Sequence, residues 1–374
     1  MNKLCRQVSI ESPGPTIKDC VFSFEVPMPD VPPHGARIRV ACAGACYRLH
    51  RTPSLSSVSS VSSISSDKSF DLPLFTSPSH PGVRDTALYP GYEVAGIVES
   101  LGSEAVADNP LKVGDRVVVF PYEGVPHGYA EFITVTDLKY LVKIPAHMPL
   151  SVAAMLPTGA LLAMNTVIHA REYTDQLFKE KGENARAKIL VVGTGGLALW
   201  ALKIASYEFQ DIETRVCISV ATLRDEGFQL AKENLRVNQV QWNEDVYEKQ
   251  LIERTIDACK GEVDIVIDFG TTSRSLHRSL QCLSRGGVVF ISAEVAERLM
   301  PKFSKRAEEK DQCIRPVDMG SIEQLEELVE LVSNRKIIPP PHTVFPAEQA
   351  TDVIQKLCHS EIPGRAILEF FSSD

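Results

Sequence analysis

The stretch AKILVVGTGGLALWALKIAS, residues 187–206, decides the fold of this 374-residue chain. A run of β-favouring apolar residues ends at a glycine-rich turn, and a helix-favouring run follows at once. The turn, residues 193–198, has the form G-x-G-x-x-A of the dinucleotide-binding fingerprint. Gly193 would make the tight turn, Gly195 would let the backbone approach a pyrophosphate, and Ala198 would permit close packing of helix on strand. The alternative is an ordinary glycine turn before a helix, but the strand before it and the helix after it favour cofactor binding.

The start of the expected helix supplies the chemistry of this site. Free N–H groups and a partial positive charge at a helix N-terminus suit the phosphates of a dinucleotide. We therefore expect five consecutive residues to bind the cofactor: Gly193, Thr194, Gly195, Gly196 and Leu197.

The end of the next expected strand bears on the choice between NAD(H) and NADP(H). An NAD site usually has Asp or Glu there to bind the ribose, whereas an NADP site removes that charge and supplies an Arg. In SVATLRD, residues 219–225, Ala221 takes the acidic position, while Thr222 offers a hydroxyl and Arg224 a positive charge. We expect NADP(H) to be preferred over NAD(H). Asp225 leaves an alternative, because it could pair with Arg224 or bind the ribose.

The composition excludes several classes of function. A net charge of −9 argues against a nucleic-acid surface. The sequence has no run of about eighteen apolar residues, so we expect no transmembrane helix. Its first residues, MNKLCRQVSIESPG, lack the apolar core of a signal peptide. The nine cysteines are scattered and odd in number, which is typical of reduced thiols, and we expect a cytoplasmic protein.

The chain before residue 187 is β-rich with glycine corners, which predicts a small barrel-like domain. Its strand-like runs are residues 21–26, 36–43, 97–100, 117–120 and 141–144, and an apolar helical stretch, residues 151–170, follows. Residues 54–66 contain nine serines in thirteen positions and interrupt this pattern. We expect a disordered surface insertion there, with a phosphorylatable loop as the alternative.

From residue 187 onward strands and helices alternate, the pattern of a parallel sheet covered on both faces. The expected strands are residues 188–192, 215–220, 263–268 and 288–292, and the expected helices are residues 197–206, 226–234 and 273–283. Residues 299–315 are charged and irregular, which predicts a surface excursion. Ser321 and Gln324 form a capping box for the next helix, and residues 365–370 form a last strand.

Together these segments resemble the medium-chain dehydrogenase/reductase superfamily, which includes zinc alcohol dehydrogenases and quinone reductases. The resemblance covers nearly the whole chain in order, through PGYE at 90–93, VGDRV at 113–117, GYAE at 128–131, the glycine turn, VDIVID at 263–268, and the pairs 286–287 and 364–365. It implies an α/β fold with a GroES-like β-barrel catalytic domain and a Rossmann doubly wound parallel sheet. The barrel domain would comprise residues 1–163 and 317–374, with a Ser-rich insertion at 54–69, and the Rossmann domain residues 164–316.

The resemblance also implies where ligands and partners bind. Nicotinamide and a small-molecule substrate would lie in the cleft between the two domains. Arg365 would lie near the cofactor, with a surface salt bridge as an equally plain alternative. A homodimer through the edge of the Rossmann sheet, around residues 288–292 and the segment that follows them, is the arrangement that analogy suggests.

The sequence departs from the zinc branch of this superfamily. Cys46 stands where the first zinc ligand would be, but the family's Gly-His-Glu is here Gly-Tyr-Glu at residues 91–93, and Pro157 stands near the third ligand. The closely spaced cysteines of the structural zinc lobe are absent, so we expect no metal and no zinc. The alternative is a metal held by Cys46, Glu93 and a neighbouring histidine, His50 or His80.

Without zinc, polarising an alcohol or ketone is difficult, whereas reducing a quinone or an activated C=C bond requires less. The proton-relay position after Cys46 is also altered, because it holds Arg48. Tyr47 and Tyr92 are therefore the candidate catalytic proton donors, with packing against the barrel wall as the alternative for Tyr92. We expect an NADP(H)-dependent, zinc-independent oxidoreductase acting on a quinone, enone or related carbonyl compound.

Two other functions stay open. The first is a catalytically lapsed member that binds nucleotide and serves as a regulatory or scaffold protein. The weaker second is an alcohol dehydrogenase with an irregular zinc site. Turnover of NADPH with quinones or enones would separate the enzyme from the lapsed member, and a metal assay would identify the zinc enzyme.

Overall fold

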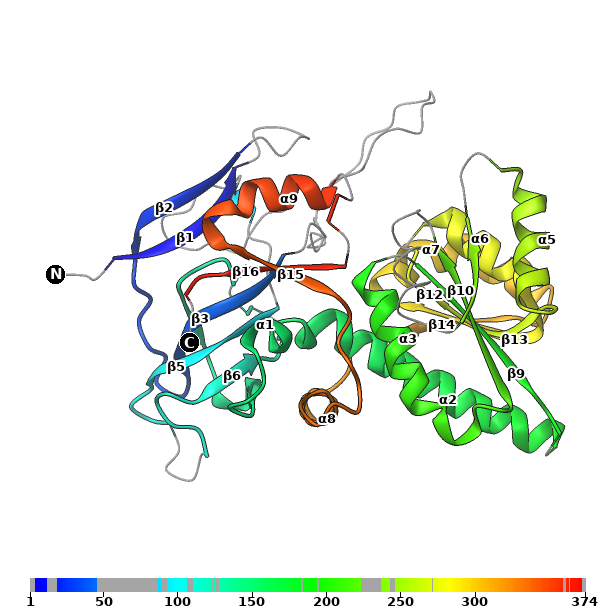
Figure 1. Ribbon diagram of the computed structural model, residues 1–374, viewed down its shortest axis with the longest axis horizontal. Coiled ribbons are helices and arrows are strands. Elements are labelled where there is room, and N and C mark those ends of the chain that lie inside the picture. Colours follow the sequence, from blue (N-terminus) through cyan, green and yellow to red (C-terminus); the bar gives the residue numbers. More distant parts are fainter. Residues whose placement is uncertain are drawn as a thin grey trace. The chain divides into compact units, whose positions relative to one another are not determined.

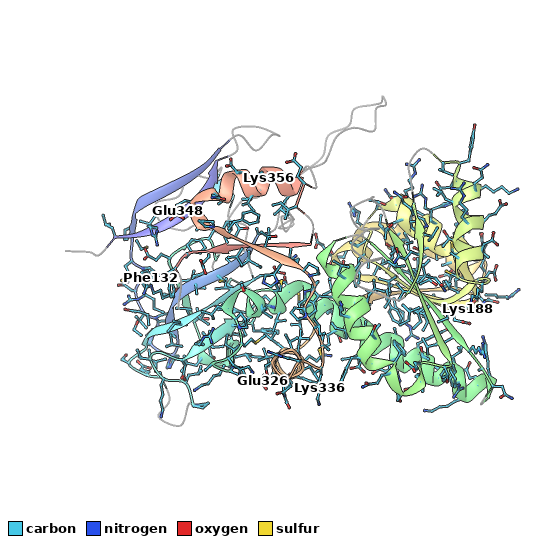
Figure 2. All side chains as sticks on the ribbon, viewed as in Figure 1. Phe132, Lys188, Glu326, Lys336, Glu348 and Lys356 are labelled. Atoms are coloured by element: carbon cyan, nitrogen blue, oxygen red, sulfur yellow. The ribbon has the colours of Figure 1, made fainter. Side chains whose placement is uncertain are left out.

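The computed structural model describes residues 4–11, 19–45, 87–88, 93–105, 110–122, 124–125, 128–182, 184–193, 195–222, 237–242, 246–270, 272–358, 361–362 and 364–371 (Figure 1). The chain divides into two compact units. Unit 1 comprises Met1–Ala154, Val344–Ile362 and Ala366–Asp374, and unit 2 comprises Met155–Thr343 and Pro363–Arg365. The expected boundaries at 163/164 and 316/317 differ from this division. The reason is that helix α8 (Ile322–Ser333) packs against α2 (Leu161–Lys181), within unit 2.

Unit 1 is built from antiparallel strands, as its alternating sequence predicts. The larger sheet has the order β15-β16-β3-β5-β6-β8, with β7 paired to β3. Its strands are β15 (His342–Pro346), β16 (Arg365–Glu369), β3 (Ala36–Ala45), β5 (Val94–Leu101), β6 (Arg116–Val119), β8 (Leu141–Lys143) and β7 (Phe132–Val135). A second sheet contains β2 (Asp19–Pro27), β1 (Leu4–Glu11) and β4 (Ala87–Leu88) in that order.

Short helices complete unit 1. They are η1 (Leu138–Tyr140), α1 (Leu150–Ala153), η4 (Ala347–Gln349) and α9 (Ala350–Cys358). Helix α9 packs on β2 and β3, and its Val353 and Ile354 belong to the same buried cluster as Ile38 and Val40 of β3. Side chains from an early and a late part of the chain therefore pack together in one core of unit 1.

Unit 2 contains a six-stranded parallel sheet with the order β11-β10-β9-β12-β13-β14. The strands are β11 (Asn238–Gln241), β10 (Val216–Thr222), β9 (Ala187–Val192), β12 (Val263–Asp268), β13 (Leu283–Ser292) and β14 (Cys313–Val317). The four expected strands overlap β9, β10, β12 and β13, and β9 lies inside the sheet, as its uninterrupted apolar sequence requires. The structure adds β11 and β14 at the two edges.

Helices cover both faces of this sheet (Figure 1). On one face α5 (Glu248–Ala258), α6 (Ser273–Cys282) and α7 (Ala293–Glu308) bury apolar side chains with those of alternate strand positions such as Val192 and Val266. On the other face lie α2 and α3 (Gly196–Glu208), which pack against each other, and α2 brings His169 over the ring of Phe290 in β13. The 3-10 turn η3 (Gln210–Ile212) follows α3. The doubly wound parallel sheet expected from the sequence is present.

The expected surface excursion at residues 299–315 is wrong. Helix α7 occupies the first part of this stretch, and β14 forms the end of it. Val295, Leu299 and Ala307 are buried along one side of α7, and this apolar side fixes the helix on the sheet despite Pro301 within it. High charge on the exposed face and an internal proline concealed the pattern.

Two expectations about helices are refined. The stretch expected as residues 151–170 is α1, the π-helix η2 (Leu156–Ala160) and the 21-residue α2 in succession. The Ser321–Gln324 capping box of α8 is confirmed, with both reciprocal bonds formed.

The Ser-rich insertion and the helix expected at residues 226–234 lie outside the described residues. Among the helices that the structure describes, none is long and apolar enough to span a membrane.

Candidate functional site

The glycine turn lies at the carboxyl end of β9, between the ends of β10 and β12. The N–H of Gly193 donates to the carbonyl of Ala221 at 3.0 Å, and the N–H of Phe269 donates to the carbonyl of Val192 at 2.9 Å. Gly193 has φ = +144°, which disfavours any residue with a side chain. A Cβ there would also approach the Cβ of Ala198 to 3.2 Å. Gly193 and Ala198 thus fit the tight-turn and close-packing roles that the sequence suggests.

Gly195 differs from Gly193, because neither its backbone angles nor any described residue requires a glycine there. Its backbone is extended (φ = −84°, ψ = −179°), and a Cβ built on it would have no atom of the described residues within 4 Å. It is exposed, stands at the N-cap of α3 and makes no side-chain cap. The open space beside this backbone fits a ligand that must come close to the first N–H groups of α3. Thr194 lies outside the described residues, and Leu197 is half-buried in the first turn of α3.

Gly196 provides a seat for Arg365. A Cβ at Gly196 would overlap the Cδ of Arg365 and come within 2.8 Å of its Cγ, so the stem of the arginine crosses directly over this glycine. The N–H of Arg365 donates to the carbonyl of Pro341 at 3.0 Å, which fixes its backbone. Arg365 therefore adds a positive charge to a helix N-terminus that already favours anions. This arrangement supports the cofactor role that the resemblance implies for Arg365.

Two of the residues predicted to set the preference between NAD(H) and NADP(H) lie at the end of β10. Ala221 and Thr222 are buried, and the Thr222 hydroxyl donates to the carbonyl of Val240 at 3.5 Å. The Thr222 carbonyl accepts from the N–H of Trp242 at 2.8 Å. The side chain of Thr222 thus faces β11, and its binding to a ribose stays a prediction. Arg224 and Asp225 lie outside the described residues.

Asp268, at the end of β12, is a site residue that the sequence analysis missed. Its Oδ1 accepts from the N–H of Gly270 at 2.8 Å and its Oδ2 from the hydroxyl of Ser279 at 2.9 Å. Only 3% of the residue is exposed, and this burial raises the pKa of the carboxyl to about 6. A carboxylate two residues before a glycine, directly after an apolar strand, is the signal that could have identified this turn. The buried carboxyl holds the end of β12 against α6, next to the glycine turn.

In unit 1, Glu93 and Tyr129 lie beside the end of β3. Glu93 is 4% exposed and its carbonyl accepts from the N–H of Gly44 at 2.8 Å. A Cβ at Gly44 would overlap the Glu93 carboxylate, and the buried Tyr129 hydroxyl donates to the Gly44 carbonyl at 3.3 Å. These contacts shape the strand end that leads toward Cys46. Tyr47, Tyr92 and Cys46 themselves lie outside the described residues, so their predicted roles stay predictions.

Within the described ranges, no group of three or more His, Cys, Asp or Glu side chains is arranged to hold a metal ion. Pro157, near the expected third ligand, is buried in η2 and offers no donor atom from its side chain. Cys46, His50 and His80 are outside the described residues, so the alternative set with Glu93 stays untested.

Comparisons with known proteins agree with this geometry. The family model described as zinc-binding dehydrogenase matches residues 244–368. The zinc-type alcohol dehydrogenase-like protein C1773.06c of Schizosaccharomyces pombe is 22% identical over 305 residues, which cover 75% of this chain and 81% of that protein. NADP-dependent alcohol dehydrogenase C 1 of Mycolicibacterium smegmatis is 21% identical over 323 residues, covering 77% and 83% of the two chains.

Another relative matches a shorter part of the chain at higher sequence identity. The trans-enoyl reductase tenC of Beauveria bassiana is 30% identical over 148 residues, covering 31% of this chain and 38% of that protein. Among solved structures, the quinone oxidoreductase of Coxiella burnetii matches with a TM-score of 0.67 at 18% identity, covering 99% of this chain and 100% of that one. At this identity the structural match establishes the fold.

Proposed function

Because this chain is a member of the medium-chain dehydrogenase/reductase superfamily, we propose that it is an NADP(H)-dependent oxidoreductase that works without zinc. Its substrate would be a small molecule with an electron-poor C=C bond or a related carbonyl group, such as an enone or quinone. The oxidoreductase class follows from the family, and the cofactor preference, the absence of zinc and the substrate class are the proposal.

The observation that carries the proposal is the cradle around Gly195 and Gly196. Space that no described residue fills lies beside Gly195, and the stem of Arg365 crosses Gly196 at the start of α3. An open backbone, a helix N-terminus and a guanidinium together suit a pyrophosphate. The residues present therefore fit a dinucleotide.

Preference for NADP(H) rests on the end of β10. The position where an NAD site usually carries an acid is occupied by the buried Ala221, so no carboxylate there repels a 2′-phosphate. Arg224, three residues further on, would pair with that phosphate. The M. smegmatis relative is named for NADP, which agrees with this assignment.

The substrate class rests on chemistry without a Lewis acid. A bound NADPH supplies a hydride, which suits an acceptor carbon made electron-poor by conjugation to a carbonyl. The hydroxyl of Tyr92 or Tyr47, or a water, would deliver the proton that completes the reduction. The similarity to a trans-enoyl reductase favours a conjugated C=C bond over a simple ketone.

Assembly and location belong to the same proposal. Strand β14 is the outer strand of the parallel sheet and pairs only with β13 among the described strands. Pairing of β14 with its copy would give a homodimer and cover this edge. We place the protein in the cytoplasm.

The proposal is tested by turnover. Purified protein is mixed with NADPH or NADH and a panel of enones, quinones, ketones and alcohols, before and after dialysis against a chelator. Faster oxidation of NADPH with an enone or quinone, unchanged by the chelator, is the expected result. Activity lost with the chelator and restored by zinc would establish the irregular zinc enzyme. Tight NADPH binding without turnover on any acceptor would establish the lapsed, regulatory member.

A further inference from the structure

The first turn of α2 lies at the same edge of the sheet as the glycine turn. The side chain of Asn165, in this turn, bonds to Asp318, which directly follows β14. Further along α2, the Tyr173 hydroxyl donates to Gly286 in the first half of β13, and Lys181 pairs with Asp264 in β12. Helix α2 therefore runs antiparallel to the strands, and its first turn meets their carboxyl ends, where ligands bind in such sheets.

Two side-chain amides join α2 and α8 at this edge. The Nδ2 of Asn165 donates to the carbonyl of Asp318 at 2.9 Å, and the Nε2 of Gln324 donates to the Oδ1 of Asn165 at 3.1 Å. The Oε1 of Gln324 accepts from the N–H of Ser321 at 2.8 Å. Three successive bonds thus attach both ends of the segment 318–321 to the two helices. We call this set of bonds the amide clamp.

The backbone of the segment 318–321 fits closely between these helices. Gly320 has φ = +112°, and a Cβ on it would approach the Gln324 Oε1 to 2.8 Å and a Leu161 methyl to 3.1 Å. Only glycine adopts this conformation easily, and the lack of a side chain lets the chain lie against α2. The segment is therefore held in one place, although Asp318 and Ser321 are exposed.

The π-helix η2 marks the same place independently. It immediately precedes α2, contacts both α3 and α8, and exposes part of Thr158 and Gly159. A π-helical turn within a helical run is often found at a functional site. The glycine turn, η2 and the segment 318–321 thus gather at one edge of unit 2.

We propose that the amide clamp makes Asn165 a positioning residue for the nicotinamide half of the cofactor site. This inference rests on the proposed function. With the pyrophosphate at Gly195 and the adenosine toward the end of β10, the other half of the dinucleotide extends over the ends of β12, β13 and β14. The segment 318–321 directly follows β14, so its fixed backbone forms a wall for the nicotinamide. Asn165 holds that wall without touching the phosphates.

Half-ligands test this assignment without relying on activity. The Kd of NADPH and that of 2′-phospho-ADP-ribose, which lacks nicotinamide, are measured for the wild type and for Asn165→Ala. The matched control is Gln176→Ala, because Gln176 is an exposed amide on α2 whose bond among the described residues stays within the helix, to Glu180. Asn165→Ala removes two bonds of the amide clamp, and we expect the displaced wall to weaken NADPH binding about three- to tenfold, an effect the size of about one hydrogen bond, and 2′-phospho-ADP-ribose binding less than twofold. Gln176→Ala should change neither.

The other possible binding results decide between failure of this inference and failure of the proposed function. An equal loss for both ligands in Asn165→Ala would overturn the inference, since the effect would then come from the fold or from the phosphates. Unchanged NADPH binding in that variant would overturn it as well, while the proposed function would stand. Wild-type protein that binds neither ligand would overturn both. Asn165→Asp keeps the acceptor for Gln324 and loses the donor to Asp318, so it should behave like Asn165→Ala.

Discussion

Replacing Gly195 by Ala should separate the stability of the fold from cofactor binding. The added methyl group meets no atom within 4 Å in the part of the chain that the structure describes, and the extended backbone at this position accepts any residue. Ala in place of Gly stabilises by restricting the unfolded chain, about 0.4–1 kcal/mol, and costs a similar amount as a poorer N-cap. The two effects oppose each other. The free energy of unfolding should therefore change by less than about 0.5 kcal/mol, or about 2 °C in Tm.

The same methyl group occupies the space where a pyrophosphate would approach the start of α3. A phosphate held away from these N–H groups loses at least one hydrogen bond to a charged group, which is worth about 1.5–3 kcal/mol. Since about 1.4 kcal/mol is a factor of ten, the Kd of NADPH should rise about 10- to 100-fold.

Tryptophan fluorescence provides the binding assay for this variant. Both of its tryptophans, Trp200 in α3 and Trp242 after β11, are buried in unit 2, so their fluorescence should report nucleotide binding. Tm without ligand and Kd by fluorescence titration are measured for wild type and Gly195→Ala. Unchanged Tm with unchanged Kd would refute the reasoning, because the phosphates would then not lie at Gly195. A large fall in Tm would show that the glycine is required by the fold itself.

Three further results are expected. Gly196→Ala should weaken NADPH binding about tenfold by displacing the Arg365 stem, but should have little effect in an Arg365→Ala background; additive losses would contradict this coupling. Burial raises the pKa of Asp268 from 3.8 to about 6, so its contribution to stability is complete below pH 3.8 and is lost as the pH rises through 6. Asp268→Asn should therefore gain up to about 3 kcal/mol relative to wild type between pH 4 and pH 8, measured by thermal melting, and a difference that does not vary with pH would count against it. Arg224→Ala should raise the Kd of NADPH about 10- to 100-fold and leave that of NADH within twofold; equal losses for both would remove Arg224 as the reader of the 2′-phosphate.

The central part of the fold could be predicted because its signals are local. The run Ile189–Val192 before the glycine turn, and the Ser321–Gln324 capping box, each specify their structure within a few residues. Strands β9 and β12 and helices α3 and α6 were accordingly placed to within two residues of their observed ends, and α8 begins directly after its predicted cap, Ser321.

Other features depend on contacts between distant residues. Helix α7 is fixed by three buried residues on a charged helix with an internal proline, and β14 is a strand because it pairs with β13. The contact of Arg365 with Gly196 joins residues 169 positions apart, and only the resemblance pointed to it. The amide clamp likewise joins α2 to residues more than 150 positions away, so no sequence pattern announces it.

The most direct test of the central claim is the Tm of the purified wild-type protein with saturating NADPH, with NADH and with neither. A ligand at a hundred times its Kd adds about 2.7 kcal/mol to stability. At about 2–4 °C per kcal/mol this raises Tm by several degrees. We expect a clear rise with NADPH and a smaller one with NADH. No rise with either would contradict the account, because the cradle of Gly195, Gly196 and Arg365 would then bind no dinucleotide.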